Sequence, residues 1–209
     1  MSIIPIDVRN VYTLDYKKCT NMSEESYSQM IFDLFNQLSS MPSGNILLHY
    51  LAKTKKVVIT NYDFYGNRLS DQFRAQVLLN RIIIPSRFKP NLHYVKMDSS
   101  VTVYKMIPPL VVVLGHELIH MAHYHLDNNS IDWSDCEENT ILGTELLKIP
   151  RDEKLFKVCE NSIRMELNLP LRINHDSEDL PRNVVYPKEN YMMIDLKIYG
   201  QKSISESNI

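Results

Sequence analysis

Apolar residues recur every three or four positions in the segment after Ser23, and this pattern predicts an amphipathic helix. The apolar stripe consists of Tyr27, Met30, Ile31, Leu34, Phe35 and Leu38. Ser23 is a suitable N-cap, and Glu24 and Glu25 place negative charge in the first turn. The sequence MPSG at 41–44 indicates the end of this helix. A second, shorter helix is predicted over 46–51.

In the stretch that follows, the pattern changes to short β-branched or alternating runs, which are typical of strands. The predicted strands are 56–62, 77–85, and a hairpin of 92–97 with 101–107, with one further strand within 1–20. An edge strand of such a sheet can hold an extended peptide by main-chain hydrogen bonds. The sequence does not say which strand lies at the edge.

The second half of the chain is mainly helical in pattern. Helices are predicted over 111–125, 136–147 and 153–167, with a polar surface loop at 127–135 that contains Trp133 and a strand at 191–199. No internal repeat or linker divides the sequence. We therefore expect an α+β fold in one compact domain over residues 1–209, with a small mixed or antiparallel sheet and flexible ends at 1–20 and 202–209.

Composition narrows the classes of partner. The formal net charge of −2 gives no reason to expect nucleic acid or an anionic membrane surface. The cysteines, Cys19, Cys136 and Cys159, are widely spaced and odd in number, which indicates a reducing compartment rather than a disulfide framework. No apolar run approaches the roughly 20 residues that span a membrane, and the start of the chain lacks a signal-peptide pattern.

The chemistry-bearing motif lies within 111–125, which reads VVVLGHELIHMAHYH. His116, Glu117 and His120 form H-E-x-x-H, and residues four apart share one face of a helix, so that both imidazoles can bind one Zn²⁺. Glu117 is placed to accept a proton from a metal-bound water. The alternative is a core helix with two hydrogen-bonded histidines, although burying such polar groups is costly unless they are paired or metal-bound.

A catalytic zinc normally has a third protein ligand. His123 shares the face of the first two histidines but lies about 10 Å along the helix from His116, which favours a position behind the ligands or in the core. Glu137 and Glu138 are better candidates, because a carboxylate from a second helix completes a His₂Glu set. Both could equally be solvated acids at a helix start.

The segments GHELIHMAHYH, CEENTILG and ENSIRMELNLPLR resemble the NleD family of type III secreted zinc metalloproteases, over roughly residues 110–175. The H-E-L-I-H-x-x-H and E-E segments also resemble the clostridial neurotoxin light chains. The resemblance implies a gluzincin-like, zincin-type protease with a glutamate five residues before a glycine as third ligand, which is Glu138 before Gly143. Glu137 would then orient a ligand. These families tend to have threonine two before the glycine, whereas here Thr140 is three before it.

The resemblance extends to the E-N-x-x-R pattern that begins at Glu160. It implies that Arg172 faces the oxyanion, and that a family tyrosine three residues later is replaced by His175, which could donate a hydrogen bond in its place. Tyr186 is another candidate for that role. Arg164 could instead form only a helix-surface ion pair with Glu160, and Arg172 could be a solvated surface arginine.

These observations predict a monomeric zinc endopeptidase. The resemblance implies a bacterial effector that is delivered by a type III route into host cytoplasm, where it would cleave a signalling protein such as a stress-activated MAP kinase in its activation loop. One alternative is a zinc-stabilised module that binds and sequesters a host protein without cutting it. Another is a protease toxin domain directed at vesicle-fusion proteins, although the light chains of that kind are far longer.

Overall fold

The computed structural model of the chain describes residues 3–20, 22–62, 76–78, 81–86, 93–96, 103–126, 133–143 and 158–174. Its elements are η1 (Val8–Asn10), β1 (Tyr12–Asp15), α1 (Glu24–Ser39), α2 (Pro42–Leu51), β2 (Val57–Thr60), β3 (Gln76–Leu78), β4 (Arg81–Ile83), β5 (His93–Lys96), β6 (Val103–Met106), α3 (Leu110–Leu126), α4 (Trp133–Leu142), α5 (Glu160–Glu166) and β7 (Leu171–Asn174). This is an α+β fold, as predicted, but its strands form two sheets, one mixed and one antiparallel, in place of the single small sheet that was expected.

The first two helices pack closely at a short connection. α1 begins as predicted, with the Ser23 hydroxyl accepting a hydrogen bond from the backbone N–H of Ser26 at 3.2 Å. α2 begins at Pro42, earlier than predicted, because proline suits a first helical position that needs no N–H donor. A Cβ on Gly44 would lie 2.2 Å from the backbone oxygen of Leu38, so only glycine allows this approach.

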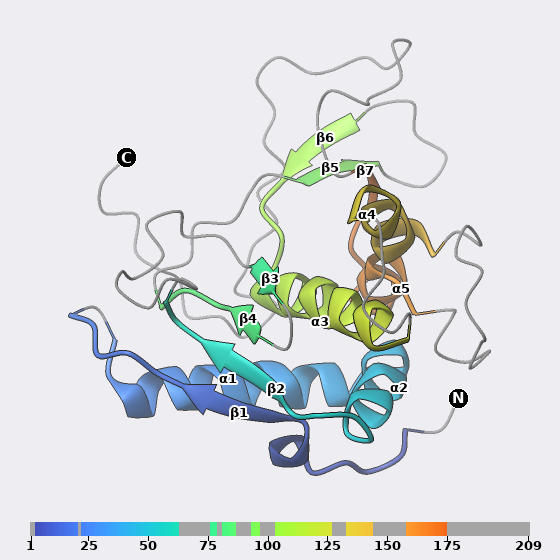
Figure 1. Cartoon of the computed structure of the whole chain (residues 1–209). Coiled ribbons are helices and arrows are strands. Elements are labelled where there is room, and N and C mark those ends of the chain that lie inside the picture. The colour runs from blue at the N-terminus through green and yellow to red at the C-terminus, as the bar shows by residue number, and fades with distance from the viewer. Residues whose placement is uncertain are drawn as a thin grey trace.

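The larger sheet has the strand order β1-β2-β4-β3. β1, β2 and β4 are parallel, and β3 pairs antiparallel with β4 at one edge. The chain passes through α1 and α2 between the first two strands, as a parallel connection requires. Figure 1 shows α1 running along this sheet. The predicted strand at 56–62 is confirmed, while the run at 77–85 contains two strands in place of one.

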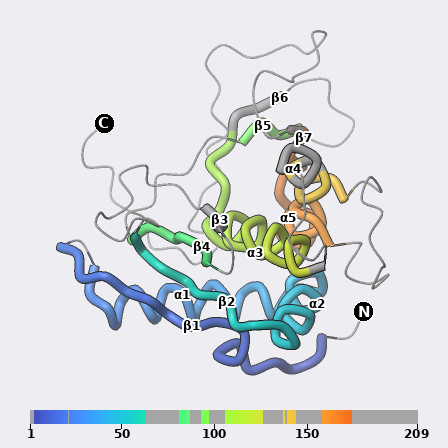
Figure 2. The backbone as a smooth tube through the Cα atoms, viewed as in Figure 1, coloured from blue at the N-terminus to red at the C-terminus, as the bar shows by residue number. Residues whose placement is uncertain are grey.

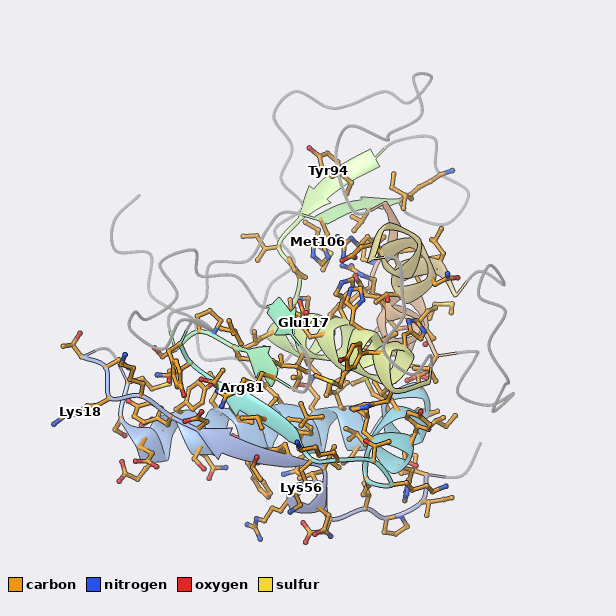
Figure 3. The ribbon with its side chains drawn as sticks, in the orientation of Figure 1. Lys18, Lys56, Arg81, Tyr94, Met106 and Glu117 are labelled. Atoms are coloured by element: carbon orange, nitrogen blue, oxygen red, sulfur yellow. The ribbon has the colours of Figure 1, made fainter. Side chains whose placement is uncertain are left out.

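The second sheet has the order β6-β5-β7 and is antiparallel. The predicted hairpin of 92–97 with 101–107 is confirmed as the antiparallel pair β5–β6. β7 was not predicted, because a four-residue strand after Pro170 has too few positions to show an alternating pattern. On β5, His93 and Val95 are buried while Tyr94 and Lys96 are half-buried, and Figure 3 shows Tyr94 on the face of the sheet away from α3.

The central helix α3 lies between the two sheets and contacts α1, α2, α4 and α5 (Figure 1). It begins just after Pro109, whose carbonyl accepts from Val112 N at 3.0 Å, in agreement with the predicted start. Residues 111–122 of this helix are all buried. Figure 2 shows that α5, near the end of the described chain, lies beside α2, and the Ser43 hydroxyl donates to Glu166 at 2.7 Å there.

The helices around α3 differ in extent from the sequence prediction. α4 begins at Trp133, inside the segment expected to be a loop, and is followed by Gly143 with φ 69°, a left-handed conformation typical of a residue that ends a helix. α5 begins only at Glu160, because Cys159 has an extended backbone. The predicted strand at 191–199 and the ends at 1–2 and 202–209 lie outside the described residues. Within the described part of the chain, no helix has the length and hydropathy needed to cross a membrane.

Candidate metal centre

The two histidines of the H-E-x-x-H motif face each other on one side of α3, as the helical spacing predicts. His116 Nε2 and His120 Nε2 lie 3.0 Å apart, and their rings are nearly perpendicular at 81°. Their exposed fractions are only 6% and 2%. Two nitrogens that can each donate a lone pair therefore converge on one buried point.

Glu137 of α4 brings a carboxylate to the same point. Its Oε2 lies 3.3 Å from His116 Nε2, and its Oε1 lies 3.1 Å from His120 Nε2. Ligand atoms bound tetrahedrally at about 2.0–2.1 Å from zinc are separated by about 3.3–3.4 Å. The two imidazole nitrogens, 3.0 Å apart, are close to that edge length, and each lies 3.1–3.3 Å from a different oxygen of the Glu137 carboxylate. One ligand atom from each of the three side chains lies within 4.8 Å of the others, so the group could hold a zinc ion after small shifts.

The third position differs from the expectation drawn from the resemblance. Glu137, which was expected to orient a ligand, lies among the ligand atoms, while the side chain of Glu138, the expected ligand, is outside the described residues. Consecutive residues on a helix point about 100° apart, and the rotation of α4 places the Glu137 carboxylate at the two histidines. The role expected for Glu138 stays a prediction. The sequence could have indicated Glu137. In the resembling families the ligand glutamate lies three residues before a threonine, and the residue three before Thr140 is Glu137.

A second carboxylate holds His116 from behind. Glu160 Oε2 lies 2.8 Å from His116 Nδ1, on the opposite side of the ring from the candidate ligand atom. With Nδ1–H donating to this carboxylate, Nε2 keeps its lone pair for a metal. Glu160 has no exposed surface, so the interaction is shielded from water.

Glu160 is itself surrounded by nitrogen atoms from three elements, two guanidinium groups and one imidazole. Arg164 Nε donates to Oε1 at 2.6 Å, Arg172 Nη1 donates to Oε2 at 2.8 Å, and His93 Nδ1 lies 3.3 Å from Oε1. Arg164 also donates to His93, and the Asn161 side chain makes two 2.8 Å hydrogen bonds with the backbone of Arg172. A buried carboxylate next to two guanidinium groups remains ionised, and its pKa lies well below the usual value in spite of burial.

These contacts change the interpretation of both arginines. Arg172 is 5% exposed, so the alternative of a solvated surface arginine is wrong. Arg164 forms the ion pair with Glu160 that the spacing suggested, but both side chains have no exposed surface, so the pair is buried and not on the helix surface. The contact seen for Arg172 is with Glu160, through which it supports His116. Its direct role toward an oxyanion stays a prediction.

Glu117 lies beside the first histidine and is 8% exposed. Figure 3 shows it on the side of α3 that faces the β5–β6–β7 sheet. Among the described residues its carboxylate has no hydrogen-bond partner, and burial raises its pKa to about 7, although the neighbouring His116 opposes the shift. A base with a pKa near neutrality suits proton transfer at physiological pH.

The pKa values of the candidate ligands depend on hydrogen bonds among these groups. Burial disfavours the charged form of His116, but hydrogen bonds to Glu137 and Glu160 outweigh it and raise the pKa of His116 to about 9. Burial alone would raise the pKa of Glu137, but hydrogen bonds from His116 and His120 hold that pKa far below its ordinary value. A cation, whether a proton or a metal ion, is therefore favoured between these groups.

The ring nitrogen of His120 that points away from the candidate metal position contacts a neutral hydroxyl group, that of Thr140. Thr140 Oγ1 is 3.3 Å from His120 Nδ1 and 3.4 Å from His123 Nδ1. His123 therefore lies behind the ligands, as predicted, and burial next to the two other imidazoles lowers its pKa to about 4.

Two residues of this site were not identified from the sequence. His93 reaches Glu160 only because β5 pairs with β7, and a lone histidine in a strand carries no signal of that. Thr140 was noted only for its register. His175 and Tyr186 lie outside the described residues, as does the side chain of Trp133.

Comparisons of the chain with protein-family models, with curated proteins and with solved structures give no match. The functional interpretation therefore rests on the site itself: a buried group of two histidines and one glutamate that could hold a metal ion, with a separate glutamate alongside.

Proposed function

We propose that the protein is a zinc-dependent endopeptidase of the zincin type. The observation that carries the proposal is the convergence of the two imidazole nitrogens, 3.0 Å apart, with the Glu137 carboxylate, whose oxygens lie 3.1–3.3 Å from them. A buried set of two imidazoles and one carboxylate is the donor set of zinc peptidases, and it leaves a fourth position for water.

The chain supplies separate groups for holding the ion and for moving a proton. Zinc, when bound to the two histidines and Glu137, would polarise a scissile carbonyl and acidify a water molecule. Glu117, which is not among the ligand atoms, would accept the proton of the attacking water and donate it to the leaving amine. Glu160 would keep His116 in the ligating tautomer.

The position of β3 supports a peptide as substrate. Within the described residues β3 is an edge strand of the larger sheet, and it contacts α3, which carries the ligands. An edge strand beside the catalytic helix could align an extended chain through main-chain hydrogen bonds. This arrangement favours cleavage within a polypeptide over hydrolysis of a small molecule.

The proposed substrate is a host signalling protein, reached through non-classical secretion. This part of the proposal rests on the resemblance of the motifs to the NleD effectors, for which stress-activated MAP kinases are the implied targets. Specificity depends on loops and surfaces rather than on the metal ligands. The experiment must therefore search for substrates widely.

The test compares host-cell lysate treated with wild-type protein and with Glu117→Gln. New peptide termini are identified by mass spectrometry, and the zinc content of each pure protein is measured by elemental analysis. We expect equal zinc in both proteins and new termini with the wild type only, because the amide cannot accept the proton. Loss of proteolysis should be at least about 100-fold.

Two controls delimit this test. Glu24→Gln makes the same chemical change at an exposed site in α1 and should cleave like the wild type. Addition of a chelator should abolish cleavage. Cleavage by Glu117→Gln at the wild-type rate would refute the assigned base, whereas stable binding of a host protein without fragments would favour a zinc-stabilised binding module.

A further inference from the structure

The two histidine ligands have unlike partners behind them. His116 Nδ1 is held by the ionised carboxylate of Glu160, which is a usual partner for a metal-bound histidine. His120 Nδ1 faces the hydroxyl of Thr140, which has no exposed surface. A neutral hydroxyl is a weaker acceptor than a carboxylate, so the support of His120 depends on what orients that hydroxyl.

Binding of a metal by His120 would determine where the protons of His120, Thr140 and His123 lie. When His120 Nε2 gives its lone pair to a metal, its only N–H is at Nδ1, so in the 3.3 Å contact with Thr140 Oγ1 the imidazole donates and the hydroxyl oxygen accepts. The Thr140 hydroxyl proton is then directed elsewhere, and His123 Nδ1 lies 3.4 Å from the same oxygen. An unprotonated His123 Nδ1 can accept it, with the His123 proton at Nε2.

We propose that Thr140, oriented by His123, is a positioning residue for the metal centre, which fixes the tautomer and ring orientation of His120. Glu137 and Thr140 are three residues apart and share a face of α4. One face of this helix thus provides both the third ligand and the acceptor behind the second. The inference rests on the proposed zinc site, but not on the proposed peptidase activity.

A positioning role needs the hydroxyl of Thr140, whereas simple packing needs only the volume of its side chain. Valine has nearly the same shape as threonine and would fill the same space, but it cannot accept from Nδ1–H. Serine keeps the hydroxyl and loses one methyl group. If Thr140 only packs, valine should be the better replacement, and if it positions His120, serine should be.

The experiment measures zinc affinity by competition with a chromophoric chelator at one fixed pH, on full-length variants whose fold is checked by circular dichroism. We expect Thr140→Val to bind zinc about 10-fold more weakly or worse, and Thr140→Ser to stay near the wild type. Thr13→Val, the same change at an exposed position of β1, is the matched control and should not alter affinity. The visible spectrum of the cobalt-loaded protein should change with Thr140→Val and not with Thr13→Val.

A double-mutant cycle tests the part assigned to His123. His123→Phe should weaken zinc binding, and the double variant should bind no worse than Thr140→Val alone, because both act through one hydroxyl. Additive losses would overturn the role of His123. Wild-type affinity and spectrum in Thr140→Val would overturn the whole inference.

The outcomes also separate this inference from the proposed function. A wild-type protein that binds no zinc would remove both. Tight zinc binding that is insensitive to Thr140→Val would remove only the inference. If Thr140→Val fails to fold, His123→Phe and Thr140→Ser carry the test: an unchanged affinity in His123→Phe, or a loss in Thr140→Ser as large as expected for valine, would overturn it.

Discussion

Replacing Glu160 by glutamine changes a carboxylate that contacts both the candidate metal ligand His116 and two buried arginines. The side chain keeps its size but loses its charge and one acceptor oxygen. In the wild type this carboxylate accepts from His116, Arg164 and Arg172 at 2.6–2.8 Å, and it has no exposed surface. The variant leaves two buried guanidinium groups without their counter-ion.

The expected loss of stability is large for a single isosteric change. Removing one partner of a buried ion pair costs about 3–5 kcal/mol, because the remaining charge is buried without compensation. The amide oxygen of glutamine can still accept one N–H, which favours the lower end, about 3 kcal/mol. For a chain of 209 residues this lowers the melting temperature by about 6–12 °C.

A second effect should appear in metal binding. Without the carboxylate, His116 Nδ1 has a weaker acceptor and the ring is less firmly oriented, so zinc affinity should fall by about 10- to 100-fold. Stability is measured by thermal and urea unfolding of the zinc-free protein, and affinity by chelator competition. Glu24→Gln is the control, because it removes one negative charge from an exposed position.

If Glu160→Gln melts within about 2 °C of the control and binds zinc equally well, the role assigned to Glu160 is refuted. A fall in melting temperature with unchanged zinc affinity would show that the carboxylate supports the arginines but does not position His116. A fall in affinity without a change in stability would contradict the charge argument.

Three further outcomes are expected. Gly44→Ala should destabilise the protein by about 1–3 kcal/mol or more in urea unfolding, because the new Cβ would meet the backbone oxygen of Leu38 at 2.2 Å. Zinc binding near pH 7.5 should release about one proton, seen calorimetrically in buffers of different ionisation enthalpy, because the His116 pKa is raised to about 9 in the metal-free protein; no release would contradict that. Burial lowers the pKa of His93 to about 4, so stability from its neutral form is complete above pH 6.5 and is lost as pH falls toward 4, by about 2 kcal/mol at pH 5. Unfolding of the zinc-free protein between pH 7 and 4.5 should therefore show a steeper decline than in His93→Gln, and parallel curves would count against this assignment.

Elements that are indicated by a pattern of neighbouring residues in the sequence were predicted well. The stripe and cap of α1, the β5–β6 hairpin and the H-E-x-x-H face of α3 all depend on residues within a few positions of each other. β7 was missed because a short strand is stabilised mainly by its partner. The start of α5 at Glu160 was missed because the apolar pattern includes Val158 and Cys159, which are not helical.

By itself, the sequence determined that His116 and His120 share one side of a buried helix, because a spacing of four residues fixes that geometry wherever the helix lies. Only the tertiary structure decided the rest of the site. The rotation of α4 against α3 brings Glu137 to the histidines, and the packing of α5 between α3 and β7 joins Glu160 to His116 and Arg172. These contacts link residues that are 12 to 44 positions apart in the chain, and no periodicity within a single element encodes how two elements meet.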